Sequence, residues 1–217
     1  MTTEQPPAEL RRAIVADLVP APPIAPPLRR ALLLLPLALV LAVLPPIVFG
    51  VRRDAGALGP VLLWGLSLVQ VVIGFLLLVA ALREAVPGRA VPFSPGLLVS
   101  GLAAALAVTW LTWSESLTVV PPGRVLFFWR ICFVSPTLLG LPLVFVALWL
   151  ALRAYPLRPA LMGALAGLGA GLVTDAGWRT FCHVADPRHV VSAHVAAVVA
   201  LSVAGTLMAV GLRRRPD

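Results

Sequence analysis

Six long apolar runs are the feature that most constrains how this chain can fold. The runs lie near residues 31–51, 58–82, 96–113, 131–152, 160–178 and 190–212. An α-helix that crosses a membrane needs about 20 predominantly apolar residues, which is close to the length of these runs. Of the 217 residues, 60% are hydrophobic and 12% are charged, whereas a soluble domain carries about 25% charged residues. We therefore predict an all-α, polytopic membrane protein built as a bundle of six transmembrane helices.

The chain divides into three predicted parts: a leader at 1–30, a six-helix transmembrane domain at 31–212 and a tail at 213–217. The first apolar run is too long for the core of a signal peptide and follows a polar leader, so we expect it to be retained. All 17 basic residues are arginines, and eleven of them fall in cytoplasmic segments if the N-terminus is inside. The positive-inside rule then predicts that leader and tail are both cytoplasmic.

The net charge of +8 raises the question of nucleic-acid binding. The arginines stand singly or in short groups at the ends of the apolar runs, where membrane topology accounts for them. We therefore expect the lipid bilayer as a partner, and no direct contact with nucleic acid.

Catalytic patterns are missing from the sequence. It contains no nucleophile with an adjacent base, no HExxH motif, no phosphate-binding loop and no paired carboxylates inside the runs. Gln70 is the main strongly polar residue deep in a run, whereas a transporter places ionisable groups near the middle of the membrane. We therefore expect neither an enzyme nor a pump.

The two cysteines are predicted to lie at the same depth on the outer side. Cys132 stands at the outer start of the fourth run, and Cys182 follows the outer end of the fifth. Since consecutive spans are often neighbours, the two thiols are expected within reach of each other. A periplasm would favour a disulfide between them. The alternative is two unrelated buried cysteines, which behave as small hydrophobic residues.

A metal site is the second interpretation of this region. The stretch "CHVADPRH" offers the candidate ligands Cys182, His183, Asp186 and His189. His194 follows one turn into the last run. Thiolate and imidazole suit soft or borderline ions, but the spacing matches no established structural zinc pattern. We therefore expect no resident cofactor, and favour a weak site that Cys132 completes with a transient soft metal ion.

Plainer interpretations of the same polar residues stay open. The Asp186–Pro187 pair is typical of a turn, and His183 and His189 fit a solvated loop. Asp175 and Arg179 are one helical turn apart and suit an ordinary ion pair.

Gly163, Gly167 and Gly171 recur every four residues in the fifth run, so they share one helix face. Small residues on such a face allow another helix to approach closely. Ordinary packing inside the bundle is the favoured interpretation. A contact between two copies of the chain, and so a homo-oligomer, is the alternative.

The leader contains a short amphipathic pattern followed by a stiff segment. Leu10, Ile14 and Leu18 lie at i, i+4 and i+8, which places them on one helix face. A helix of about three turns is marginal alone in water, so this face is expected to fold against a partner or on the lipid surface. The segment "VPAPPIAPP" favours an extended polyproline II stalk. A docking helix held at the membrane is the favoured interpretation.

Three stretches of the chain together resemble the membrane anti-sigma factors of the negative regulator of sigma F type (NrsF-like). They are "LRRAIVADLVPAPPIAPPLRRALLL", "CFVSPTLLGLPLVFVALWLALRAYPLRPALMGALAGLGAGL" and "FCHVADPRHVVSAHVAAVVALSVAGTLMAVGLRRR". The resemblance covers nearly the whole chain, although the second and third runs match only in hydropathy.

The resemblance implies a protein that holds an extracytoplasmic-function (ECF) sigma factor at the bacterial inner membrane through its leader. Residues Leu10, Ile14 and Leu18 would then bind the sigma factor. Cys132 and Cys182 would report metal or redox stress, after which the sigma factor is released. Two rival functions are a membrane thiol-disulfide oxidoreductase, which generally needs a second cysteine pair, and a metal-efflux accessory protein.

Overall fold

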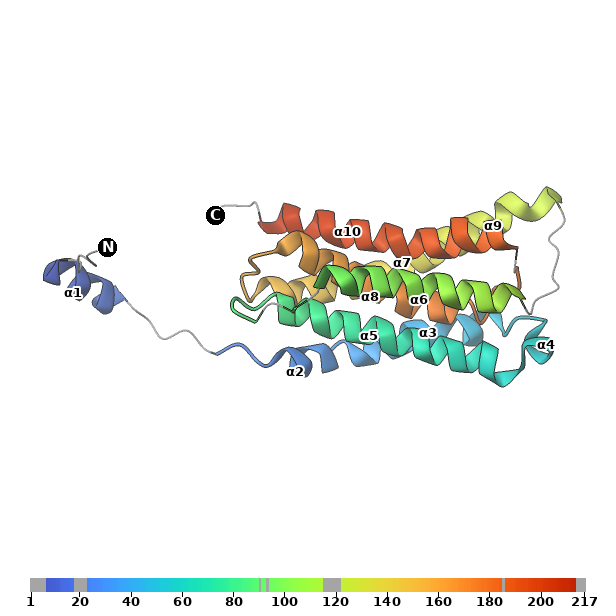
Figure 1. The fold of residues 1–217 in the computed structure, drawn as a ribbon, viewed down its shortest axis with the longest axis horizontal. Helices are drawn as coiled ribbons and strands as arrows, with labels where there is room; N and C mark the ends of the chain where they lie inside the picture. The colour runs from blue at the N-terminus through green and yellow to red at the C-terminus, as the bar shows by residue number, and fades with distance from the viewer. Residues whose placement is uncertain are drawn as a thin grey trace.

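The computed structural model of the protein describes residues 7–17, 23–89, 91–92, 94–114, 122–184 and 186–213. Every regular element in these ranges is helical, which confirms the predicted all-α fold (Figure 1). The elements are α1 (Ala8–Asp17), α2 (Pro27–Leu32), α3 (Leu35–Phe49), α4 (Ala55–Pro60), η1 (Val61–Gly65), α5 (Leu66–Glu84), α6 (Ser94–Ser114), η2 (Pro122–Arg124), α7 (Val125–Leu152), α8 (Pro159–Trp178), α9 (Pro187–His189), η3 (Val190–Val195) and α10 (Ala196–Arg213). Of these, η1 and η3 are π-helical turns.

Six helical segments among the described residues are long and apolar enough to cross a membrane. They are Pro27–Phe49, Ala55–Glu84, Ser94–Thr112, Val125–Leu152, Pro159–Trp178 and Pro187–Arg213. Each coincides with one predicted run. The first segment begins at Pro27, inside the predicted leader, because proline is favourable in the first turn of a helix.

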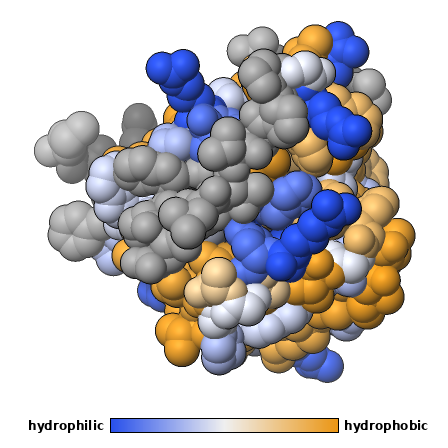
Figure 2. Space-filling view, turned by 90° about the vertical axis from the view of Figure 1, so that its right-hand side faces the viewer, coloured by the Kyte–Doolittle hydropathy of each residue, from blue (hydrophilic) through white to orange (hydrophobic). Residues whose placement is uncertain are grey.

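The outer surface of the bundle is apolar along its length. Large exposed side chains include Leu68, Val99, Leu138, Phe145 and Leu207. Figure 2 views the bundle end-on, from the right-hand side of Figure 1, and hydrophilic residues are present on this end while apolar residues cover much of its rim. An apolar flank of this extent is suited to lipid rather than water.

Helix α8 lies at the centre of the bundle. It packs against α3, α5, α6, α7 and α10, and nearly all of its side chains are buried. The sequence of α8 permits this position because it consists largely of glycine, alanine and leucine, and small residues let several helices approach at once.

The predicted glycine face of α8 lies against α10. A methyl group added to Gly167 would stand 2.0 Å from the carbonyl oxygen of Leu201, and one added to Gly163 would stand 2.3 Å from that of Gly205. Gly171 meets the backbone of Val198 in the same way. Since α10 occupies this face, the face packs the bundle internally and does not offer a surface to a second copy of the chain.

Arg30 fastens the first span to the end of the bundle at which the leader joins, called here the leader end. Its guanidinium is buried, and it donates hydrogen bonds to the carbonyl oxygens of Leu150 at 3.0 Å and Leu82 at 2.8 Å. These acceptors lie near the C-termini of α7 and α5, where helix carbonyls have no partner in their own helix. Glu84 forms an ion pair with Arg158 at the end of α5.

Helix α1 is exposed along its whole length and stands apart from the bundle (Figure 1). Leu10 and Ile14 are 52% and 49% exposed. Leu18, the third residue of the predicted stripe, lies outside the described residues. Pro26 has φ −52° and ψ 146°, in the polyproline II region predicted for the stalk. The apolar face of α1 therefore has no partner among the described parts of the chain.

Candidate functional site

The two cysteines lie side by side at the end of the bundle opposite the leader, called here the cysteine end. Cys132 belongs to α7 and Cys182 to the segment after α8, and their Sγ atoms are 3.3 Å apart. Both side chains are buried, and both are free thiols. The predicted approach of the two thiols is confirmed. Trp178 and Ala193 belong to the same buried cluster and pack around the pair.

Two histidines complete a cluster with the cysteines. The Nε2 atom of His189 lies 3.6 Å from Sγ of Cys182, and the ring centroids of His189 and His194 are 5.6 Å apart. Cys132, Cys182, His189 and His194 each offer one ligand atom, and these four atoms lie within 4.8 Å of one another. All four residues are buried. We call them the Cys₂His₂ cluster.

The local backbone explains why both histidines face the cysteines. The carboxylate of Asp186 accepts hydrogen bonds from the backbone N–H groups of Arg188 and His189, which starts the last span at Pro187. The π-helical turn η3 follows directly. In an α-helix, residues five apart point about 140° away from each other, whereas a π-helical turn pairs residues i and i+5. The turn therefore brings His194 to the side on which His189 lies.

Two of the predicted metal ligands lie outside this cluster. The ring of His183 packs edge-on against Phe128, with centroids 5.4 Å apart, and Asp186 is occupied by the helix cap. His194, which stood outside the predicted ligand set, takes a place in the cluster instead. The signal that sequence reasoning missed is the five-residue spacing of His189 and His194 across a π-helical turn.

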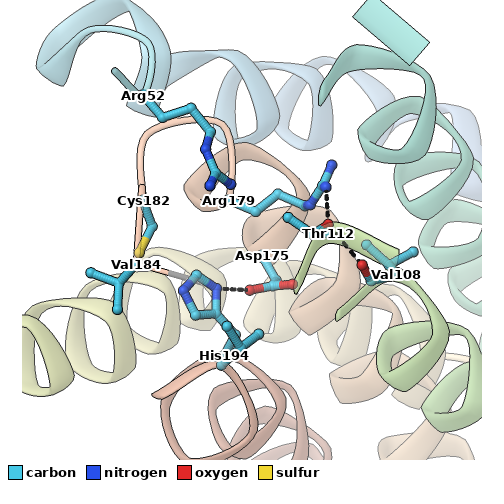
Figure 3. A pocket seen from close by; sticks show the side chains of 9 residues that line it. Arg52, Val108, Thr112, Asp175, Arg179, Cys182, Val184 and His194 are labelled. Carbon is cyan, nitrogen blue, oxygen red and sulfur yellow. Dashed lines mark hydrogen bonds and ion pairs between the residues drawn. The ribbon is translucent and has the colours of Figure 1, made fainter. Parts of the chain in front are cut away.

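Asp175 connects the cluster to two other helices. Its Oδ1 atom lies 2.7 Å from Nδ1 of His194, and its Oδ2 atom accepts a hydrogen bond of 2.6 Å from Nε2 of Gln70. All three side chains are buried. The carboxylate of Asp175 in α8 thereby links Gln70 of α5 to His194 of the last span. Because Nδ1 of His194 bonds to Asp175, its Nε2 atom remains available to the cysteines. In Figure 3, Asp175 lies beside His194, and the sulfur of Cys182 points toward the same ring.

Arg179 does not form the predicted pair with Asp175. Its guanidinium donates to the carbonyl oxygens of Leu62 and Leu63 and to the hydroxyls of Ser67 and Thr112. The carbonyl acceptors lie in η1, where the π-helical turn disturbs the regular hydrogen bonding. Burial lowers the pKa of Arg179 to about 10, so the side chain stays cationic at neutral pH.

A small pocket lies beside the cluster, and Figure 3 shows side chains that line it. Its volume is about 20 Å³, enough for a single water molecule or ion. Its lining includes Arg52, Asp175, Arg179, Cys182 and His194. Charged side chains of Arg52, Asp175 and Arg179 therefore line the same pocket as Cys182.

The surroundings of Cys182 favour its thiolate. A hydrogen bond with Cys132, together with contacts from His189 and His194, lowers the pKa of Cys182 well below its ordinary value, although burial acts in the opposite direction. The thiolate is the form that attacks oxidants and binds metal ions. Two chemistries are therefore open to the cluster: oxidation of the thiol pair to a disulfide, and coordination of a soft or borderline ion.

Comparison with known families assigns the chain. The profile of the NrsF family, described as negative regulator of sigma F, matches residues 14–214. The protein belongs to the NrsF family. Membership makes this NrsF protein a negative regulator of a sigma factor, with a sigma factor as its partner. The match spans the last turn of α1, from Ile14, and all six membrane segments. No match was found among curated proteins or among solved structures.

Proposed function

We propose that the protein holds an ECF sigma factor at the bacterial inner membrane and releases it under metal or redox stress. In this proposal α1 covers the surface with which the sigma factor binds RNA polymerase, and Cys132 and Cys182 receive the signal. The observation that carries the proposal is the unpartnered apolar face of α1, at the opposite end of the molecule from the buried thiol pair.

The proposed topology puts leader and tail in the cytoplasm and the cysteine end in the periplasm. The arginine distribution supports this direction because cytoplasmic segments of membrane proteins are enriched in basic residues. A sigma factor is a cytoplasmic protein, so its anchor must face the same side. The cysteine end then faces the compartment in which external metal ions and oxidants arrive first.

The proposal assigns no catalytic role and no resident cofactor to the protein. A thiol-disulfide oxidoreductase that passes electrons to a quinone generally needs two cysteine pairs, and the sequence contains two cysteines in all. Bound quinone and turnover of thiols by the purified protein would favour the oxidoreductase. Zinc or copper binding that persists without Cys132 would favour a metal-efflux accessory protein.

Replacing Ile14 by aspartate is expected to make the sigma factor constitutively active. Burial of an isoleucine contributes about 1.5–3 kcal/mol, and a buried, unpaired carboxylate adds a further cost. The complex is therefore expected to weaken about 100-fold or more, since each 1.4 kcal/mol is a factor of ten. The measurement is a promoter reporter for the sigma factor in unstressed cells.

The matched control for this test is Ala16→Asp. Ala16 lies in the same helix but points to the side opposite Ile14, so the reporter is expected to stay low. Immunoblots of membranes establish that both variants are present in equal amounts. A reporter that remains low with Ile14→Asp contradicts the docking of α1.

A further inference from the structure

We propose that the Cys₂His₂ cluster is a tetrahedral binding site for one Zn²⁺ ion, in which Asp175 is the positioning residue that orients His194. The inference deepens the proposed function, since it names the ligand of the sensing thiols. Its test requires no sigma factor, because the site is complete within this chain.

The donor set is that of a closed zinc site. Structural zinc is held by four ligands that are cysteine sulfurs or histidine nitrogens, and two of each is a common combination. Here the four donors come from α7, from the segment after α8 and from the start of the last span. A bound ion would therefore cross-link three segments that side-chain hydrogen bonds and packing already bring together at this position.

The distances between donors are close to those that Zn²⁺ requires. Zn–S bonds of about 2.3 Å and Zn–N bonds of about 2.0–2.1 Å in a tetrahedron place sulfur and nitrogen about 3.6 Å apart and two sulfurs about 3.8 Å apart. Cys182 and His189 already stand at 3.6 Å. The sulfurs, at 3.3 Å, need to separate by about half an ångström. No donor pair is more than 4.8 Å apart, so closing the site brings the most distant donors together by at most about 1.5 Å.

The outer shell of the cluster is also that of a zinc site. A histidine that binds zinc commonly donates its second N–H group to a carboxylate, which fixes the ring and its tautomer. Asp175 holds Nδ1 of His194 in this way and is itself held by Gln70. The indole Nε1 of Trp178 is buried beside the cysteines and has no hydrogen-bond partner among the described residues. A zinc-bound thiolate next to it supplies an acceptor.

Charge balance favours an ion of charge +2 in this buried position. Two thiolates neutralise Zn²⁺, and Asp175 lies in the same pocket as the cationic Arg179. A neutral metal–thiolate unit avoids the large cost of a bare charge inside the bundle. The small pocket borders two of the four donor residues, Cys182 and His194.

The test is a titration of the reduced, purified full-length protein with Co²⁺, followed by Zn²⁺. Co²⁺ reports geometry through its visible spectrum. One Co²⁺ per chain is expected, with the intense bands of tetrahedral coordination and sulfur-to-metal charge transfer, and Zn²⁺ is expected to displace it. His189→Ala and His194→Ala are each expected to lower Zn²⁺ affinity at least 10-fold and to weaken the tetrahedral bands.

Two further variants separate ligands from neighbours. Asp175→Asn is expected to lower Zn²⁺ affinity about 10–100-fold while the tetrahedral spectrum persists at saturating Co²⁺, because this residue acts through His194. His183→Ala is the matched control, since its ring lies against Phe128 outside the cluster, and its affinity is expected to equal that of the wild type. Circular dichroism and gel filtration establish that each variant is folded.

Two outcomes overturn the inference. One is unchanged Zn²⁺ affinity in both folded histidine variants, which means that the cysteines bind alone. The other is an octahedral Co²⁺ spectrum without charge-transfer bands, which means that the sulfurs are not ligands. Either outcome leaves the Ile14 reporter test intact, so failure of the zinc site is distinguishable from failure of the anti-sigma function.

Discussion

A protein with Gly167 replaced by alanine is expected to unfold at a much lower temperature than the wild type. The added methyl group would stand 2.0 Å from the carbonyl oxygen of Leu201 and 2.6 Å from its carbonyl carbon. These are backbone atoms of a long helix, so no side-chain rotation relieves the clash. α8 and α10 must move apart, and α8 is the helix against which five others pack. Overpacking of a core costs about 1–3 kcal/mol and occasionally more, and we expect the upper end here.

The measurement is thermal unfolding of the purified full chain in detergent, with Gly211→Ala as the matched control. Gly211 lies in α10, and a methyl group there has no neighbour within 4 Å. The control is expected to unfold at or slightly above the wild-type temperature, since alanine favours a helix more than glycine does. Equal unfolding temperatures for the two variants would contradict the close contact of α8 with α10.

Replacement of both Cys132 and Cys182 by serine is expected to give a repressor that no longer responds to stress. Serine has nearly the shape of cysteine, so the buried pair should still pack and the sigma factor should stay bound at rest. A hydroxyl neither forms a disulfide nor binds a borderline metal ion with the strength of a thiolate. Complete loss of induction is therefore expected, for zinc salts and for a thiol oxidant alike.

A promoter reporter in cells treated separately with each inducer checks this result. His183→Ala serves as the control and is expected to retain induction, because its ring lies outside the Cys₂His₂ cluster. Retained induction in the double serine variant would remove the sensory role of the cysteines. High reporter activity without any inducer, at normal protein levels in the membrane, would also contradict a purely sensory role of the cysteines. The thiol pair would then be needed for repression itself.

The architecture could be predicted from the sequence because hydropathy alone determines which segments enter a membrane. The six runs, the helical class and the shared depth of Cys132 and Cys182 follow from run lengths and from alternation across the bilayer. The glycine spacing in the fifth run predicted a close helix contact. That the contact is with α10 could not be predicted, because spacing identifies a face of one helix and says nothing about its neighbour.

The polar part of the site could not be predicted for a different reason. Six apolar helices carry little information on how each is rotated about its own axis, so the pairing of Asp175 with Gln70 and His194 is not visible in the sequence. The π-helical turn η3 adds a further change of rotation between His189 and His194. The positive-inside rule also counts every arginine as if it lay at the membrane surface and reported which side it is on. Arg30 and Arg179 instead turn inward, because exposed helix carbonyls and hydroxyls offer better partners than lipid does.

The hydrogen bonds of Arg30 depend on the relative position of α5 and α7 at the leader end. Its planar guanidinium spans α5 and α7, and these helices contribute Gln70 and Cys132 to the polar network at the far end. Either bond of Arg30 is lost once its acceptor retreats beyond about 3.5 Å from the donor nitrogen. A shift of α5 relative to α7 by less than about 1 Å is therefore enough to break a hydrogen bond of Arg30, which lies near the start of the first membrane segment.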